Sequence, residues 1–147
     1  MVRGSESQFH YWDLRRRGIP QSEISMDHNI SRQAVSKAIM AQERNVEIRL
    51  LQHAESSGIL VEWYNSSLGI LIGIIPPLGD IICIMLIDRT DKIRIHYDPE
   101  ALKGRSGREK AFSRLKEDLE SILGKDFIKT GQMKIILNSI VKEGIRK

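Results

Sequence analysis

The sequence predicts an α+β fold in which a three-helix unit and a long helix precede an antiparallel sheet of about four strands, itself covered by helices. Three observations support this fold class. Residues 7–57 are rich in helix-forming residues, with apolar positions three and four apart. Residues 59–97 contain short β-branched segments separated by turn residues. Residues 111–142 return to the helical period.

Composition narrows the class of protein. The 147 residues are 41% apolar, which permits a sizeable core, and only 5% aromatic, which argues against stacking on a single nucleic-acid strand. The net charge of +4 suits a nucleic-acid partner without requiring one. Residues 101–147 carry twelve basic against six acidic side chains, whereas residues 58–100 carry three against six. The single cysteine and the lack of a signal pattern favour a cytoplasmic protein.

A first helix is expected from Ser7, a capping residue, to Arg17, and Gly18 ends it in a left-handed conformation. The apolar side chains of this helix are Phe9, Tyr11, Trp12 and Leu14. The run Arg15–Arg17 has two interpretations. It is either a charged helix end that the helix dipole favours, or a clamp for DNA phosphates.

A second, short helix is expected over Gln21–His28. Pro20 lies at its entrance, where a missing N–H costs little. Ile24 faces inward, and Ser25 supplies the small side chain that two closely crossing helices need.

A tight turn leads from this helix to a third one. Asn29 tolerates a left-handed backbone, Ile30 fills the turn, and Ser31 caps a helix that begins at Arg32. His28 stands where a leucine is commoner. The spacing is that of a helix-turn-helix, whose last helix enters the DNA major groove. Its positions are filled by Ile24, Ser25, Asn29, Ile30, Val35 and Ala38, with Ile39 on the same buried face.

The opposite face of the third helix carries side chains suited to reading DNA. Arginine bonds bidentately to guanine and glutamine to adenine, while serine and lysine reach base edges or phosphates. The start of the second helix is placed to hold a phosphate. The predicted DNA-binding residues are Gln21, Ser22, Ser31, Arg32, Gln33, Ser36 and Lys37. The same pattern is compatible with a generic three-helix bundle that has a polar surface.

Two segments of this unit, Leu14–Ile24 and Ile30–Ser36, carry a resemblance to a known family. They resemble the N-terminal domain of archaeal Tfx-type regulators, and they are also similar to the helix-turn-helices of LuxR-type proteins and of sigma region 4. The resemblance covers residues 7–45. It implies sequence-specific binding of double-stranded DNA in transcription regulation, and it does not extend to residues 58–147.

From Arg32 to Ser57 the chain lacks proline and glycine. Either one helix about 37 Å long or two helices with a bend near Asn45 fits this stretch. The apolar seam is Val35, Ile39, Val46, Leu50 and Ala54, completed by Leu51. A single helix would place two DNA-reading units of a dimer about 34 Å apart, one DNA turn.

Beyond Gly58 the composition changes to strands joined by short turns, which predicts an antiparallel meander. The expected strands are Ile59–Tyr64, Leu68–Ile75, Ile81–Ile87 and Ile93–Tyr97. Residues 68–87 contain one charge, Asp80, and match a membrane span in length. Pro76 and Pro77 interrupt them, so two central strands are favoured, with a bilayer hairpin as the alternative.

Two strands this apolar need cover on both faces. Amphipathic helices over residues 111–123 and 132–142 supply one cover, and a second copy of the chain is expected to supply the rest. We therefore expect a homodimer whose interface is formed by the linker helix or by the second domain. Residues 103–110 form a basic loop in this interpretation, either solvated or in contact with phosphates.

The sequence contains no pattern that indicates an enzyme. It has no phosphate loop, no dinucleotide glycine pattern and no zinc-ligand spacing, so no catalytic residue, cofactor or metal is expected. Cys83 is expected to be a buried structural thiol. Asp80 and its diproline loop are the best candidate for an effector site, and a hairpin turn explains them equally well.

We therefore expect a helix-turn-helix DNA-binding domain at residues 1–45, a linker helix at 46–57, and an α+β dimerisation or effector domain at 58–147. The expected function is that of a cytoplasmic, homodimeric, sequence-specific transcription regulator with room for a small-molecule effector. The alternative is a membrane-associated signalling protein with residues 68–87 in the bilayer. A third interpretation, a protein-docking module, predicts no salt-dependent DNA affinity.

Overall fold

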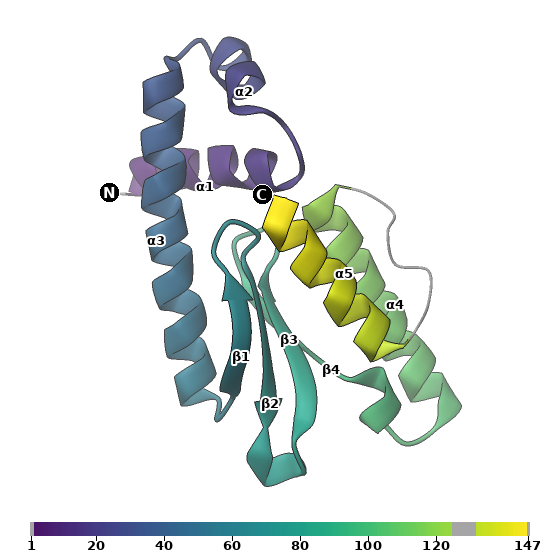
Figure 1. Cartoon of the computed structure of the whole chain (residues 1–147). Coiled ribbons are helices and arrows are strands. Elements are labelled where there is room, and N and C mark those ends of the chain that lie inside the picture. Colours follow the sequence, from purple (N-terminus) through teal and green to yellow (C-terminus); the bar gives the residue numbers. More distant parts are fainter. Residues whose placement is uncertain (1, 125–131, 147) are drawn as a thin grey trace.

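The chain folds into five α-helices and one four-stranded sheet, as seen in a computed structural model that describes residues 2–124 and 132–146 (Figure 1). The helices are α1 (Val2–Arg16), α2 (Gln21–Asp27), α3 (Arg32–Ser56), α4 (Arg105–Leu123) and α5 (Met133–Arg146). The strands are β1 (Leu60–Asn65), β2 (Ile70–Ile75), β3 (Ile81–Ile87) and β4 (Ile93–Tyr97). The predicted α+β class is confirmed.

The sheet is an antiparallel meander in the order β1-β2-β3-β4, which confirms the predicted strand pairing. The two apolar strands, β2 and β3, pair over their whole length, from Ile70 opposite Leu86 to Ile75 opposite Ile81. Residues 68–87, the candidate bilayer hairpin, thus form the centre of the sheet. Among the described residues, no helix combines the length and the apolar character needed to cross a membrane.

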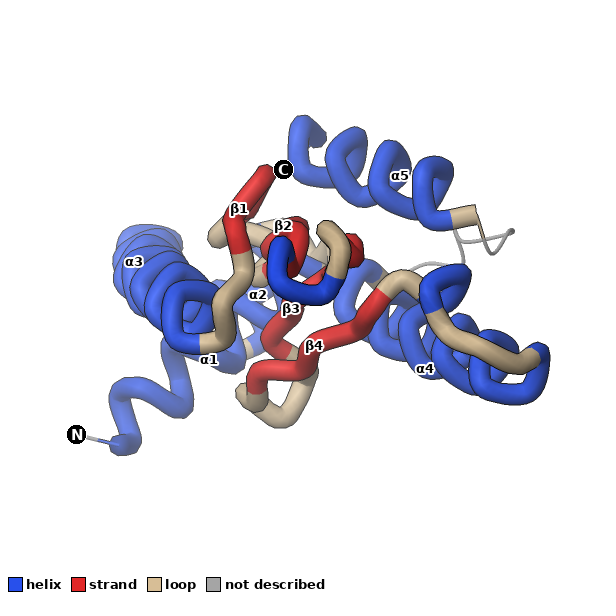
Figure 2. Tube along the Cα trace, turned by 90° about the horizontal axis from the view of Figure 1, so that it is seen from below, coloured by secondary structure: helices blue, strands red, loops and turns tan. Residues whose placement is uncertain are grey.

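Helices cover both faces of the sheet (Figures 1 and 2). Leu71, Cys83 and Met85 pack in one core with residues of α1, α2 and α3. Ile72 and Ile84 belong to a second core with residues of α4 and α5. Because side chains alternate along a strand, each apolar strand supplies both cores. The apolar strands therefore do not by themselves call for a dimer. The helices of the same chain cover the sheet face that a second copy was expected to cover.

The first core extends across the predicted boundary near residue 58. It contains Trp12, Ile24 and Val35 from the first three helices together with Leu71 and Met85 from the sheet. The packing shows no gap between the helical unit and the sheet at this boundary.

Helix α3 is one continuous helix of 25 residues, so the alternative with a bend near Asn45 is wrong. Its buried stripe contains the predicted apolar seam except Leu51, which is half-buried, together with Gln42, which the periodicity of apolar residues did not single out. At 1.5 Å per residue the helix is about 37 Å long. Its C-terminal half packs beside β1, and its N-terminal end carries α2 beyond the edge of the sheet (Figure 1).

Two predicted boundaries are wrong. Helix α1 begins at Val2 rather than Ser7, because nothing in residues 2–6 interrupts a helix as proline would. The expected basic loop at residues 103–110 is mostly helix, since α4 begins at Arg105. Gly104, with φ +88°, is the N-cap of α4, and Gly107 is tolerated on the exposed surface of its first turn.

Arg16 joins α1 to the sheet through a buried guanidinium group. It is 1% exposed, and its Nε donates to Asp13 over 2.9 Å. Its terminal nitrogens donate to the carbonyl oxygens of Leu68 (3.1 Å), Ile87 (2.6 Å) and Asp88 (3.2 Å). The phosphate-clamp interpretation is therefore wrong for Arg16, whose donors are already used inside the protein.

The surroundings of Arg16 decide its charge. Burial lowers its pKa to about 10, while the attraction and hydrogen bond of Asp13 oppose that change. The side chain therefore remains positively charged at neutral pH. Its guanidinium carbon also lies 4.3 Å from the ring centre of Trp12, whose indole N–H donates to the Ser66 carbonyl over 2.9 Å.

Replacing Arg16 with methionine should lower the free energy of unfolding by about 3 kcal/mol, because Asp13 and three carbonyl groups lose a buried donor. Urea unfolding measures the change. Arg15→Met, one residue earlier and half-buried, is the matched control and should cost less than about 1 kcal/mol. Equal losses in the two variants would show that the buried network is not what stabilises the fold.

Gly69 tests the packing between α1 and the turn before β2. Its φ is +73°, and an added Cβ would lie 2.6 Å from the Trp12 ring. Gly79 has a similar φ of +82° with open space around its Cα. Gly79→Ala should cost about 1 kcal/mol of backbone strain, and Gly69→Ala about 2 kcal/mol more because of the steric clash. Similar unfolding free energies for the two variants would contradict this packing.

Candidate nucleic-acid interface

The turn between α2 and α3 has the predicted local conformation. Asn29 is left-handed with φ +53°, and the Ile30 N–H donates to the Ser25 carbonyl over 3.0 Å. The Ser31 hydroxyl accepts the Ala34 N–H over 3.0 Å and so caps α3. Ile24 and Ser25 are buried as predicted. These contacts fix how α2 is joined to the start of α3.

His28, the least usual residue of the pattern, makes polar contacts where leucine would make apolar ones. Its Nδ1 lies 2.9 Å from the Ile24 carbonyl, which can only accept, so Nδ1 carries a proton. Its Nε2 lies 3.2 Å from the Nε2 of His10 on α1. The Tyr11 ring meets His28 edge-on at 5.1 Å between centroids. His28 thus holds α2 against α1.

Four of the predicted DNA-binding residues follow one another on the first turns of α3. Arg32, Gln33 and Lys37 are exposed, and Ser36 is half-buried. The opposite face of these turns is buried through Val35 and Ile39. The structure therefore brings these four polar side chains to one accessible end of the molecule.

The other three predicted residues occupy helix starts. Gln21 and Ser22 begin α2 and are half-buried, while Ser31 is exposed between the two helices. The hydroxyl of Ser31 already accepts the capping N–H, so its structural role explains its presence without DNA. Gln21 lines a small hollow of about 130 Å³ with Arg15 and Glu43.

The three consecutive arginines of α1 have different surroundings. Arg15 is half-buried beside Gln21, Arg16 is buried in the sheet contact, and Arg17 lies 3.4 Å from the carboxylate of Asp13. Arg15 and Arg16 line the same hollow as Gln21, but the donors of Arg16 are used in its contacts with Asp13 and the sheet. The clamp interpretation stays a prediction for Arg15 and Arg17.

Arg44 is a candidate contact that sequence reasoning missed. It is exposed on α3 two turns after Lys37, and both residues line a hollow of about 290 Å³. Gln8 of α1 borders the same hollow, whose base is Ala34, Ala38 and Ala41. The seven-residue spacing from Lys37 would have indicated Arg44, because such positions share one helix face.

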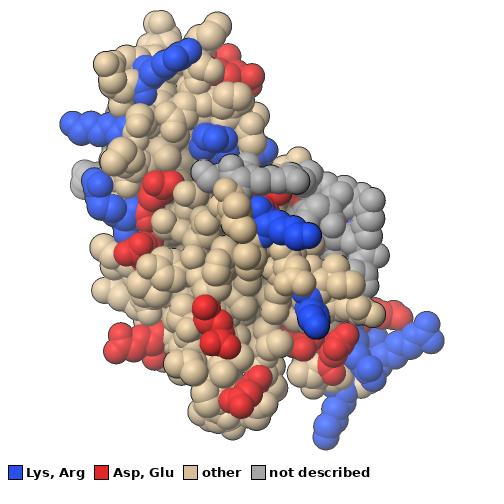
Figure 3. All heavy atoms as spheres, viewed as in Figure 1, with Lys and Arg blue, Asp and Glu red and all other residues tan. Residues whose placement is uncertain are grey.

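Beyond Arg44 the remaining arginine of α3, Arg49, is paired with Asp91 over 2.6 Å. Glu43 accepts the Ser67 hydroxyl over 2.6 Å, and the charge of Glu47 raises the pKa of Tyr64 on β1. Figure 3 shows lysine and arginine side chains along the upper part of α3 and acidic ones lower down, over the sheet and the far end of the helix. On this face the basic side chains of α3 thus lie on its upper part, and a separate basic group lies on the exposed start of α4, at Arg105, Arg108 and Lys110.

The described residues give little support for a metal site. No group of three histidine, cysteine, aspartate or glutamate side chains within residues 2–124 and 132–146 lies close enough to hold an ion. Cys83 is buried as predicted, and burial raises the pKa of its thiol, which disfavours the reactive thiolate. Asp80 is exposed with φ +58° in the turn between β2 and β3, which is the hairpin role that explained it from the sequence.

No protein-family model matches the chain, and neither a curated protein nor a solved structure matches it.

Proposed function

We propose that the protein is a sequence-specific DNA-binding transcription regulator whose α2 and α3 act as a helix-turn-helix. The observation that carries the proposal is the division of the N-terminal end of α3 into a polar face and a buried face. Its polar face is exposed through Arg32, Gln33 and Lys37, while Val35 and Ile39 bury the opposite face. A helix held in this way presents its side chains to the major groove, which admits one α-helix.

The exposed side chains have the hydrogen-bonding groups that groove reading requires. Arg32 matches the two acceptors of guanine, and Gln33 matches the acceptor and donor of adenine. Lys37 and Arg44 follow along the helix, where they would neutralise phosphates. Gln21 at the start of α2 and Arg15 near the end of α1 would fix the register by further phosphate contacts.

The proposed regulator acts as a homodimer. Residues 1–57 carry eight basic against seven acidic side chains, so one copy has little electrostatic affinity for DNA. Two copies double the number of contacts and read a two-fold symmetric operator, with half-sites about 34 Å apart. The part of the chain after residue 57 would hold the two copies together or sense an effector.

Arg32→Ala and Gln33→Ala should each remove the preference for one base pair of the operator, because each removes a bidentate contact worth about 2 kcal/mol. Selection from random DNA measures the preference of each variant. Gln52→Ala, exposed near the other end of α3, is the control and should select the wild-type operator. An unchanged preference in both Arg32→Ala and Gln33→Ala would refute their assignment as base-reading residues.

Lys37→Ala and Arg44→Ala should each weaken DNA binding and lower the salt slope of the affinity by about 1, because each releases one counterion fewer. Titrations at several salt concentrations give this slope. Lys134→Ala removes an exposed lysine of α5 and should leave it unchanged. If the wild-type protein has no salt-dependent DNA affinity, α3 is instead a surface for docking another protein.

A further inference from the structure

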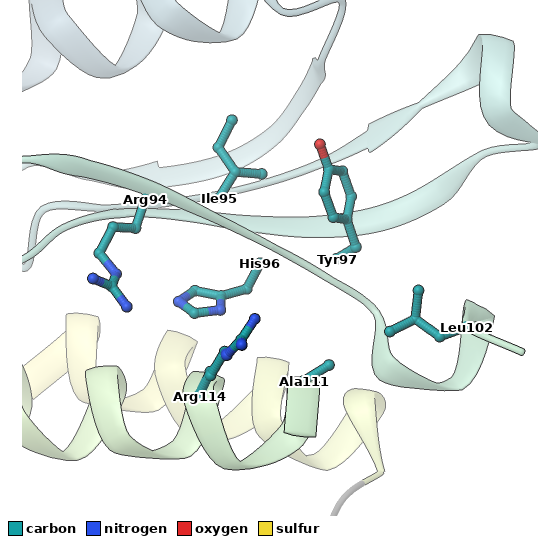
Figure 4. A pocket seen from close by; sticks show the side chains of 7 residues that line it. All are labelled: Arg94, Ile95, His96, Tyr97, Leu102, Ala111 and Arg114. Carbon is teal, nitrogen blue, oxygen red and sulfur yellow. The ribbon is translucent and has the colours of Figure 1, made fainter. Parts of the chain in front are cut away.

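A hollow of about 440 Å³ lies between β4 and α4, away from the proposed DNA-reading end (Figures 1 and 4). Its volume falls within the range of small-molecule sites. The residues that line it are Arg94, Ile95, His96, Tyr97, Leu102, Ala111 and Arg114. Figure 4 shows the side chains of Arg94, His96 and Arg114 on the side of β4 that faces α4. Three nitrogen-rich side chains therefore converge on one space.

One carboxylate holds two of these side chains in place. The Oδ2 of Asp118 lies 2.6 Å from His96 Nε2 and 2.8 Å from Arg94 Nε. His96 and Asp118 are largely buried, with side chains 10% and 14% exposed. Because the strand and the helix each contribute to this contact, the hollow has a fixed wall rather than a set of free surface side chains.

Arg114 is the positively charged side chain of the hollow that does not take part in the contact with Asp118. It lies one helical turn before Asp118 on α4, and no described carboxylate approaches it within ion-pair distance. Arg114 also borders a second hollow of about 430 Å³ that contains Lys110 and Glu109, and the carboxylate of Glu109 is paired with Arg105 over 3.0 Å. An anion placed against Arg114 would therefore meet a second positive charge close by. Leu102 and Ala111 offer apolar contact to the rest of such a molecule.

We propose that the hollow between β4 and α4 binds a small organic oxyanion, a carboxylate or a phosphate ester, through Arg114. Arginine presents a planar pair of donors that matches both kinds of oxyanion. Arg94 and His96, held by Asp118, form the wall against which the anion sits. This binding needs no DNA and is independent of the function proposed for α3.

The test is a titration of the full chain with sodium benzoate, with inorganic phosphate and with neutral benzamide, followed by calorimetry and by the backbone amide signals of residues 94–97 and 111–118. Saturable shifts with benzoate or phosphate are expected, and none with benzamide. Benzoate alone would indicate a carboxylate ligand and phosphate alone a phosphate ester.

Arg114→Gln should weaken this binding about tenfold, the loss of one charge-assisted hydrogen bond. Arg108→Gln is the matched control, because it makes the same charge change at an exposed position of α4 that does not line the hollow. Arg108→Gln should stay within about twofold of the wild type. Both side chains are exposed, so the unfolding midpoint should not move in either variant.

Three results would overturn the proposal: no saturable shift with either anion, equal weakening in the two variants, or equal binding of benzamide. A fourth is weaker DNA binding by Arg114→Gln while neither anion binds, which would assign the side chain to a DNA phosphate. The absence of DNA binding by the wild-type protein would count against the proposed function alone, since the anion titrations contain no DNA.

Discussion

The buried guanidinium of Arg16 is the interaction on which the rest of the structure depends. A charge in the protein interior is tolerated only when it is paired and its donors are satisfied. Asp13 supplies the pair, and carbonyl groups at the end of β3 and just before β2 supply acceptors. The helical unit and the sheet therefore meet in one orientation, in which each completes the surroundings of this residue.

This orientation determines what α3 can do. Val46, Leu50 and Ala54 bury the C-terminal half of α3 in the core shared with the sheet. The N-terminal end extends past the sheet with α2, so its polar face remains accessible (Figure 1). One helix thus serves as structural support and as candidate reading surface. Arg32, Lys37 and Arg44 lie on the accessible half, whereas the other half carries Glu47, Glu55 and Arg49, which pairs with Asp91.

The turn between β3 and β4 contacts both the buried Arg16 and the wall of the hollow beside α4. The backbone carbonyl of Asp88 accepts a hydrogen bond from Arg16, and its carboxylate lies 3.8 Å from Arg94. Burial tends to raise the pKa of this carboxylate, but the hydrogen bonds that it accepts from the Thr90 hydroxyl and from the N–H groups of Lys92 and Thr90 outweigh it, so the pKa is lowered. The segment that fixes the helical unit is thus in contact with the wall of the hollow beside α4.

The sequence by itself determined the local structure. The strands, the left-handed Asn29, the Ser31 cap and the buried stripe of α3 depend on periodicity and turn chemistry within a few residues. Tertiary packing decided the rest. Arg15, Arg16 and Arg17 are chemically identical, and only the docking angle of α1 decides which one is buried. Arg94, His96 and Arg114 are separated by up to twenty positions, and they form one site only because β4 packs against α4. No pattern of neighbouring residues could predict this site, because its formation depends on how elements far apart in the sequence bury their apolar faces against each other.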